Sequence, residues 1–302
     1  MRKLRTIVGT STSITAAFIG LSLCSAGWAQ THVTSAAILV AKNQELKAQL
    51  ANNQFGRPLI LESSESASIV EGNVYAVLDS PFVAVSRTFT SPQRWCDVMI
   101  LHINTKYCHA AQSTAPTRLD VSIGRKTQQQ RRDAFALDFD YELIAASPDY
   151  FSILLSAKKG PLGTSDYRIE LQAVPLPDNR TFMRLRYAYG YGVASRVVMQ
   201  GYLATAGRGK VGFTRIGQGT ETAFVGGMRG AAERNIMRYY LAIEAYQASL
   251  DRPQAERLEA SLQHWFSATE QYPQQLHEVE KSSYMTMKRV EYERQQSAEP
   301  QN

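Results

Sequence analysis

Strict alternation of apolar and polar residues predicts three β-strands in this chain, at 137–143, 167–173 and 183–189. Side chains on a strand point alternately to its two faces, so each segment offers one face to a core and one to water. Turn residues at 159–163 and 177–179 separate these segments, which predicts hairpins and an antiparallel sheet. In the first strand the expected core set is Leu137, Phe139, Tyr141 and Leu143, opposite Asp138, Asp140 and Glu142.

Apolar residues at helical spacing predict helices at 35–52, 233–250 and 254–270. The helix at 233–250 is apolar around most of its circumference, so other elements should cover it on several sides. After residue 273 the chain is polar and charged, and we expect this tail to fray.

Two serine–proline pairs, at 80–81 and 91–92, predict the starts of two short helices. Each pair places a capping hydroxyl before a proline at the first helical position. Both helices carry apolar residues on one face, so both should lie against a core.

Four charged residues recur at helical spacing along the long helix: Arg229, Glu233, Arg234 and Arg238. We favour ordinary surface ion pairs for them, which contribute little to stability. The alternative is that they line a cavity and face an anionic ligand group, since the helix is otherwise so apolar.

The first 29 residues have the features of a secretory signal. Arg2, Lys3 and Arg5 precede an uncharged and largely apolar run at 7–23, and small residues stand at Gly27 and Ala29. We therefore expect cleavage after Ala29 and a periplasmic or secreted protein. An N-terminal membrane anchor is the alternative, and a lipoprotein at Cys24 is disfavoured because Leu23 is too large for a lipobox.

The composition of the mature chain suits a globular protein and argues against nucleic acid as a partner. Removal of the signal leaves 273 of the 302 residues, with 30 basic and 27 acidic side chains. This near balance and the lack of a dense basic run do not favour nucleic-acid binding.

Two cysteines remain after the signal, Cys96 and Cys108. In an oxidising compartment such a pair favours a disulfide. Free thiols stay open, as does a metal site with His102 and His109, although the spacing matches no standard zinc pattern. We expect the disulfide and no metal.

No catalytic constellation stands out in the sequence. Gly207 to Gly212 fits the G-x-G-x-x-G pattern, but apolar residues that continue as strand or loop follow it where a dinucleotide site needs a helix. We therefore expect no cofactor, and enzymatic activity remains an open question with a leaning against it.

The segments Asp79 to Val85 and Thr90 to Cys96 resemble the opening of the START and birch-pollen-allergen-like (SRPBCC) superfamily. In that superfamily a strand ends in a short helix, and a second short helix carries a tryptophan, here Trp95. Gly160 to Arg168 is similar to its sheet hairpins, and Ala231 to Leu250 to its long C-terminal helix. The chain as a whole also resembles uncharacterised exported proteobacterial proteins.

The resemblance implies an α+β helix-grip fold, with an antiparallel sheet wrapped around the long helix. The divisions would be a signal at 1–29, a helix and linker at 30–58, the helix-grip domain at 59–250, and a helical extension with a polar tail at 251–302. The extra N-terminal helix, the glycine-rich stretch at 206–230 and the second C-terminal helix depart from the superfamily pattern.

The superfamily further implies a cavity between sheet and helix that takes a hydrophobic or amphipathic small molecule, with an envelope lipid as one candidate. Two other functions stay open: a scaffolding envelope protein that acts through its C-terminal helices, and a hydrolase or cyclase with an unrecognised site. Peripheral membrane contact and the identity of any protein partner also stay open. The expected ligand-binding residues are Phe139, Tyr141, Tyr187, Tyr189, Met237, Tyr240 and Leu241.

Overall fold

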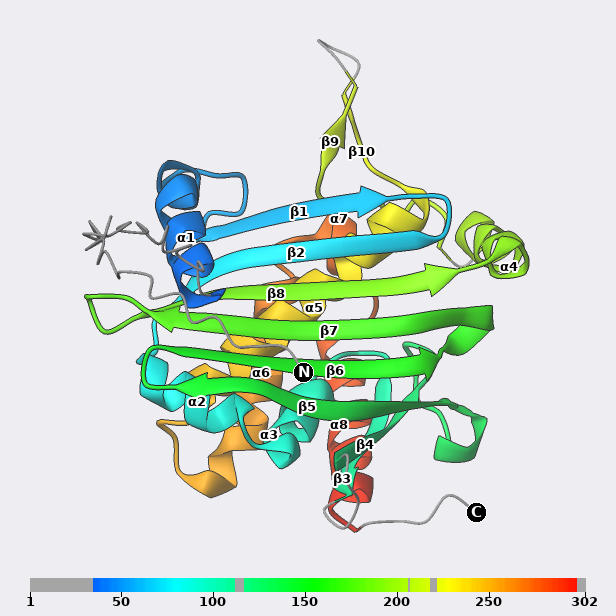
Figure 1. Cartoon of the computed structure of the whole chain (residues 1–302). Helices are drawn as coiled ribbons and strands as arrows, with labels where there is room; N and C mark the ends of the chain where they lie inside the picture. Colours follow the sequence, from blue (N-terminus) through cyan, green and yellow to red (C-terminus); the bar gives the residue numbers. More distant parts are fainter. Residues whose placement is uncertain (1–34, 112–116, 206, 218–221, 298–302) are drawn as a thin grey trace, which may run out of the picture. The chain divides into compact units, whose positions relative to one another are not determined.

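An eight-stranded antiparallel sheet forms the centre of the fold (Figure 1). The computed structural model describes residues 35–111, 117–205, 207–217 and 222–297, so the predicted signal lies outside the described residues. The spatial order of the strands is β1-β2-β8-β7-β6-β5-β4-β3. The strands are β1 (Leu59–Glu65), β2 (Ile69–Leu78), β3 (Thr105–Ala111), β4 (Thr117–Ile123), β5 (Phe135–Ser147), β6 (Tyr150–Lys159), β7 (Thr164–Pro175) and β8 (Thr181–Tyr191).

Helices lie on both sides of this sheet, and a short hairpin of β9 (Arg215–Ile216) and β10 (Ala223–Phe224) stands apart from it. The helices are α1 (Ser35–Ala51), α2 (Phe82–Phe89), α3 (Pro92–Met99), α4 (Val193–Ala204), α5 (Gly227–Ser249), α6 (Gln254–Thr269), α7 (Pro273–Leu276) and α8 (Lys281–Gln296). In the described part of the chain, no helix combines the length and the apolar character that a membrane span requires.

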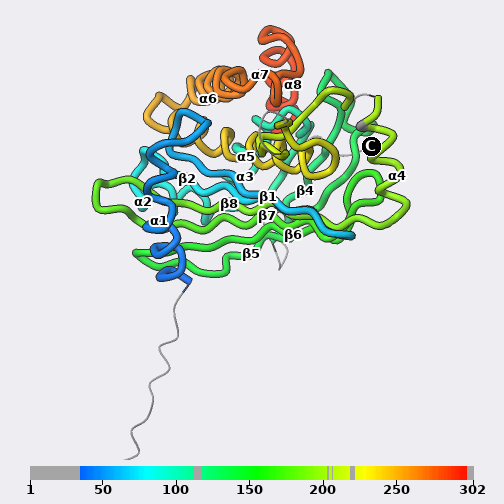
Figure 2. The backbone as a smooth tube through the Cα atoms, turned by 90° about the horizontal axis from the view of Figure 1, so that it is seen from above, coloured from blue at the N-terminus to red at the C-terminus, as the bar shows by residue number. Residues whose placement is uncertain are grey.

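The long helix α5 lies between the sheet and the C-terminal helices (Figure 2). It packs closely on β2, where a Cβ added at Gly72 would meet Cγ2 of Ile236 at 3.2 Å. Glycine at this position therefore lets the helix approach the strand. The expected α+β helix-grip fold is confirmed, and the long helix begins at Gly227, earlier than the sequence pattern predicts.

Each face of the sheet has its own apolar core, as strand alternation requires. Along β2, Val74 and Ala76 point into the main core under α5, α3 and α8. Their neighbours Tyr75 and Val77 point the other way and pack under α1 through Leu46 and other residues of that helix. The predicted N-terminal helix therefore covers the outer face of the sheet.

One residue of the expected core set of β5 is on the surface. Leu143 is 44% exposed, although it pairs with Ile153 of β6, which is buried in the main core. The register of β5 against β6 shifts only beyond this pair, between Leu143 and Ala145, as at a β-bulge. The prediction that the side chain is buried was wrong for Leu143, whereas Leu137, Phe139 and Tyr141 are buried as predicted.

The two serine–proline pairs do start short helices, but without the expected side-chain caps. Ser91 is the N-cap residue of α3, and Pro81 takes that position in α2. Neither helix has a side-chain capping hydrogen bond. The predicted disulfide is present and joins Cys96 of α3 to Cys108 of β3, so it ties the helix to the edge strand of the sheet.

The segment after Pro273 does not fray, contrary to the sequence prediction. It forms α7 and α8, and α8 buries Tyr284, Lys288 and Glu291 against the rest of the chain. The carboxylate of Glu291 forms ion pairs with two buried ammonium groups, Nζ of Lys106 at 2.9 Å and Nζ of Lys288 at 2.8 Å. We call these three residues the buried lysine cluster; they fasten α8 to β3.

Candidate functional site

A cavity of about 180 Å³ lies between α5, α4 and one end of the sheet. The turn between α3 and β3 contributes His102 and Asn104, and the loop after β4 contributes Lys126. A one-turn 3-10 helix, Pro161–Gly163, and residues Met199 and Tyr202 of α4 complete the wall. The remaining lining residues are Ile123, Leu137, Thr164, Tyr167, Tyr187, Tyr189, Ala231, Arg234, Asn235, Arg238 and Tyr239.

Helix α5 presents a single stripe of side chains to this cavity. The five lining residues are Ala231, Arg234, Asn235, Arg238 and Tyr239. Their spacing of three, then one, three and one positions is that of one helix face, since a turn takes 3.6 residues. Three of the five are polar, so α5 gives the cavity a largely polar stripe.

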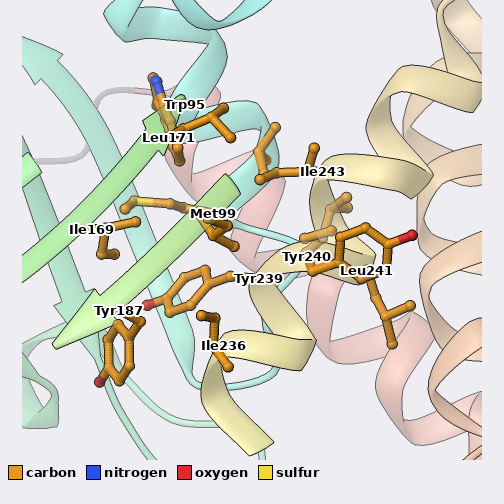
Figure 3. Packing of buried hydrophobic residues seen from close by; sticks show 14 of the residues in the cluster. Trp95, Met99, Ile169, Leu171, Tyr187, Ile236, Tyr239, Tyr240, Leu241 and Ile243 are labelled. Atoms are coloured by element: carbon orange, nitrogen blue, oxygen red, sulfur yellow. The ribbon is translucent and has the colours of Figure 1, made fainter. Parts of the chain in front are cut away.

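Four tyrosines form a continuous aromatic wall, which we call the tyrosine wall: Tyr167, Tyr187, Tyr189 and Tyr239. The ring centroids of Tyr167 and Tyr189 are 5.2 Å apart and stacked, and those of Tyr187 and Tyr239 are 5.8 Å apart. Figure 3 shows Tyr239 directed from α5 toward Tyr187. Burial raises the pKa of Tyr167 to about 12 and raises that of Tyr239 further, so these phenols stay neutral at neutral pH.

At one end of the cavity, basic side chains gather around one carboxylate. We call Lys126, Arg234 and Arg238, together with Glu278, the cationic end. Nζ of Lys126 and Nη2 of Arg238 each lie 2.6 Å from Oε1 of Glu278. Glu278 stands between α7 and α8, so the C-terminal segment supplies the acid of this site.

Arg234 and Arg238 are buried, with 5% and 2% of their surface exposed, and Glu233 is fully buried. The favoured prediction of surface ion pairs was therefore wrong for these residues, and the cavity-lining alternative holds for the two arginines. Glu233 instead faces the glycine-rich loop, where its Oε2 accepts hydrogen bonds from the backbone N–H groups of Phe213 and Thr214. That loop makes no dinucleotide-type strand-to-helix turn; it is held against α5 by this carboxylate.

Electrostatics at the cationic end follow from burial and crowding of like charges. Burial, with Arg238 nearby, lowers the pKa of Lys126 to about 8, although Glu278 acts in the opposite direction. Burial and the same neighbour lower the pKa of Arg234 to about 10. Burial raises the pKa of Glu278, but Arg238 and Lys126 lower it by more, so the carboxylate is ionised.

His102 is a neutral donor at this end of the cavity. Its ring is buried, and burial together with the charges of Arg238 and Lys288 holds its pKa well below the usual value. Nδ1 accepts the backbone N–H of Asn104 at 3.2 Å, which leaves the proton of the neutral ring on Nε2. The ring stacks on Tyr239 with centroids 4.6 Å apart, so it extends the tyrosine wall to the cationic end.

The sequence-predicted ligand residues divide between the cavity and the solid core. Tyr187 and Tyr189 line the cavity. Met237, Tyr240 and Leu241 are fully buried and do not line the cavity. Figure 3 shows Tyr240 and Leu241 on a side of α5 that faces away from Tyr187. Phe139 and Tyr141 are buried farther along β5, where the Tyr141 hydroxyl donates to the carbonyl of Phe89 at 3.2 Å. Ligand binding by any of the seven stays a prediction.

Several cavity residues had no place in the predicted set, above all His102, Lys126, Arg234, Asn235 and Arg238. A signal for three of them was present in the sequence, because Arg234, Asn235 and Arg238 are polar positions at i, i+1 and i+4 of an apolar helix. In the described part of the chain, no group of three or more His, Cys, Asp or Glu side chains is arranged to hold a metal ion.

Comparison with known proteins gives only distant structural likenesses. No protein-family model and no curated protein sequence matches the chain. A conserved protein from Geobacillus kaustophilus is 13% identical with a TM-score of 0.34, over 59% of this chain and 95% of that one. The protein Ara h 8.0201 is 10% identical with a TM-score of 0.34, over 60% and 99%.

A third solved structure, the Zhui aromatase/cyclase from Streptomyces sp. R1128, is 8% identical with a TM-score of 0.32, over 66% of this chain and 94% of that one. At such low identity and TM-score these likenesses carry no argument about what this chain binds or catalyses. The helix-grip fold rests on the chain's own strand order and on the position of α5.

Proposed function

We propose that this chain is an exported protein that binds one small amphipathic molecule in the cavity between the sheet, α4 and α5. The observation that carries the proposal is the cavity itself, because it joins an aromatic wall to a charged end. Binding sites for small molecules combine apolar walls with a few convergent polar groups in this way.

The volume of the cavity limits the size of the ligand. An apolar cavity of about 150 Å³ in another protein takes up benzene. The cavity of this chain, at about 180 Å³, therefore suits a single ring or a short aliphatic chain. An envelope lipid would enter it only with part of one acyl chain, so the geometry favours a smaller ligand.

Export is supported by two independent features. The first 29 residues carry the charge and hydropathy pattern of a secretory signal. The bond between Cys96 and Cys108 is of the kind that persists in oxidising compartments.

A substitution that fills the cavity tests the binding proposal. Ala231 lines the cavity from α5, so Ala231→Leu places three extra carbon atoms into its space. Native mass spectrometry of the exported wild-type protein should detect a bound small molecule, and the Ala231→Leu protein should lose it. Ala248→Leu is the matched control, because Ala248 is an exposed position of the same helix.

The result expected is loss of the bound mass in the Ala231→Leu protein, with a thermal midpoint close to that of the Ala248→Leu protein. Equal occupancy in both variants would contradict the cavity as the binding site. An empty wild-type protein that copurifies with a partner bound through α6 and α8 would favour the scaffolding function instead.

A further inference from the structure

We infer that the ligand is an organic anion: a carboxylate carried by an apolar body about the size of one ring, with the carboxylate at the cationic end. This inference rests on the proposed function, since it names the chemical class of the molecule that occupies the same cavity. Three separate features of the wall carry it: a charge excess, unused donors, and the direction of the tyrosine wall.

The charge excess comes from several cations that share a single acid. Glu278 Oε1 contacts Lys126 and Arg238, and its Oε2 lies 3.6 Å from Nζ of Lys210. Arg234 has no carboxylate within 4.0 Å among the described residues, and its Nη1 donates only to the carbonyl of Val211, at 3.2 Å. Buried cations without matching anions are costly, so an added negative group at this end lowers the free energy.

The unused polar groups beside the cationic end are donors. Within the described residues, Nε of Arg238 and Nε2 of His102 are buried without a hydrogen-bond partner. Both side chains line the cavity, and the neutral His102 ring carries its proton on Nε2. Unpaired donors call for an acceptor, and a carboxylate is a group with acceptors only.

The direction of the tyrosine wall places the apolar body of the ligand. The wall runs from Tyr189 through Tyr187 to Tyr239, and the stacked His102 ring connects it to the charged end. A ring that packs on these tyrosines directs a substituent toward Arg234 and Arg238, which share the cavity stripe of α5 with Tyr239. The site thereby selects for an aromatic or short apolar acid.

Three compounds with one ring and different head groups test the inference: 3-phenylpropanoate, 3-phenylpropanamide and 3-phenylpropylammonium. Isothermal titration at pH 7 and low salt should rank the carboxylate first, by at least about tenfold over the amide, with no binding of the ammonium compound. The amide retains the ring and the hydrogen-bonding carbonyl, so the difference isolates the charge.

A matched pair of variants locates the charge. Arg234→Met removes a buried cation that lacks a carboxylate partner among the described residues, so the fold should tolerate the change. The substitution should weaken the binding of 3-phenylpropanoate by about tenfold and leave the affinity for the amide unchanged. Arg252→Met removes the same charge at an exposed position beyond the end of α5 and should change neither affinity.

The possible outcomes separate this inference from the proposed function. If none of the three compounds binds, the ring-sized binding function itself is overturned. If the amide or the ammonium compound binds as tightly as the carboxylate, the cavity binds small molecules but the anion inference is wrong. Equal loss of carboxylate affinity in Arg234→Met and Arg252→Met would assign the effect to net charge and would also overturn the site.

Discussion

The buried lysine cluster and the cationic end of the cavity both lie close to the turn between α3 and β3. The two groups differ in how their cations are paired with acids. In the buried lysine cluster, Nζ of Lys106 has Glu291 and the carbonyls of Ile103 and Thr127. Nζ of Lys288 has Glu291 at 2.8 Å and two backbone carbonyls at 2.7 Å. At the cationic end, one acid serves several cations, and donors of Arg238 and His102 remain unused among the described residues.

The difference teaches how to tell a structural charge from a binding one. In the buried lysine cluster each ammonium group has a carboxylate and two backbone carbonyls, so no cation is left for a ligand and the cluster specifies how α8 docks on β3. A cluster with spare donors beside an open cavity is incomplete by itself, and its missing partner is the acceptor that a ligand supplies. Burial alone does not distinguish the two groups, because Lys288 and Arg238 are both almost fully enclosed.

The largest expected effect comes from breaking the paired cluster. Glu291→Leu leaves Lys106 and Lys288 buried without a carboxylate, which should reduce the free energy of unfolding by about 3–5 kcal/mol in denaturant titration. The triple variant Lys106→Met, Glu291→Leu, Lys288→Met removes all three charges and should recover most of that loss. A triple variant no more stable than Glu291→Leu would show that packing, rather than charge pairing, holds α8.

The next largest effect comes from the disulfide between Cys96 and Cys108. The segment between these two cysteines contributes residues both to the buried lysine cluster and to the cationic end of the cavity. Between Cys96 and Cys108 lie His102 of the cavity and the carbonyls of His102 and Thr105 that bind Lys288. Replacing both cysteines by alanine should lower stability by about 3 kcal/mol in the chain-entropy model for a loop of this length. Wild-type protein in reductant is the comparison, and an unchanged unfolding midpoint in both would contradict the prediction.

The smallest effect is a pH dependence confined to the cationic end. The pKa of Lys126 is about 8, and the groups facing it are Glu278, Arg238, Arg234 and His102. A ligand that needs the ammonium form should bind about tenfold more weakly one unit above that pKa. Titration of 3-phenylpropanoate from pH 7 to pH 9 measures this loss, and Lys126→Met should give a flat profile over the same range.

Stability should move in the opposite direction over that pH range. The pKa of Lys126 is lower in the folded chain than its ordinary value of 10.5, so the unfolded chain holds more protons above pH 8. The free energy of unfolding therefore increases as the pH rises from about 8 toward 10, and Lys288, with a pKa of about 8, contributes in the same sense. If stability and affinity fell together as the pH rises, unfolding of the protein, rather than loss of the proton of Lys126, would be the cause of the weaker ligand binding.

The sequence predicted the strands, the long helix and the disulfide because these depend on local periodicity and on cysteine pairing. It predicted two cavity residues, Tyr187 and Tyr189, since β8 alternates and its inner face meets α5. It placed the helix contribution on Met237, Tyr240 and Leu241, because a helix that is apolar on most sides does not reveal which side a cavity adjoins.

The C-terminal segment escaped prediction for a related reason. The buried face of α8 includes Lys288 and Glu291 among its inward positions, so its pattern of polarity is that of an exposed helix. Their partner Lys106 lies 185 residues before Glu291, and no local pattern connects the two. Sequence periodicity reports only local patterns, so it does not reveal that a charged residue is buried against a partner far away in the sequence.

This distant pairing also governs when the protein can finish folding. The acids that complete the two groups, Glu278 and Glu291, are synthesised long after Lys106 and Lys126, which precede them in the chain. Until α8 emerges from the ribosome, the turn at His102 lacks the contact of Lys288 with its carbonyl. The nascent chain therefore cannot complete the buried lysine cluster before α8 has been synthesised, so folding around this turn finishes late.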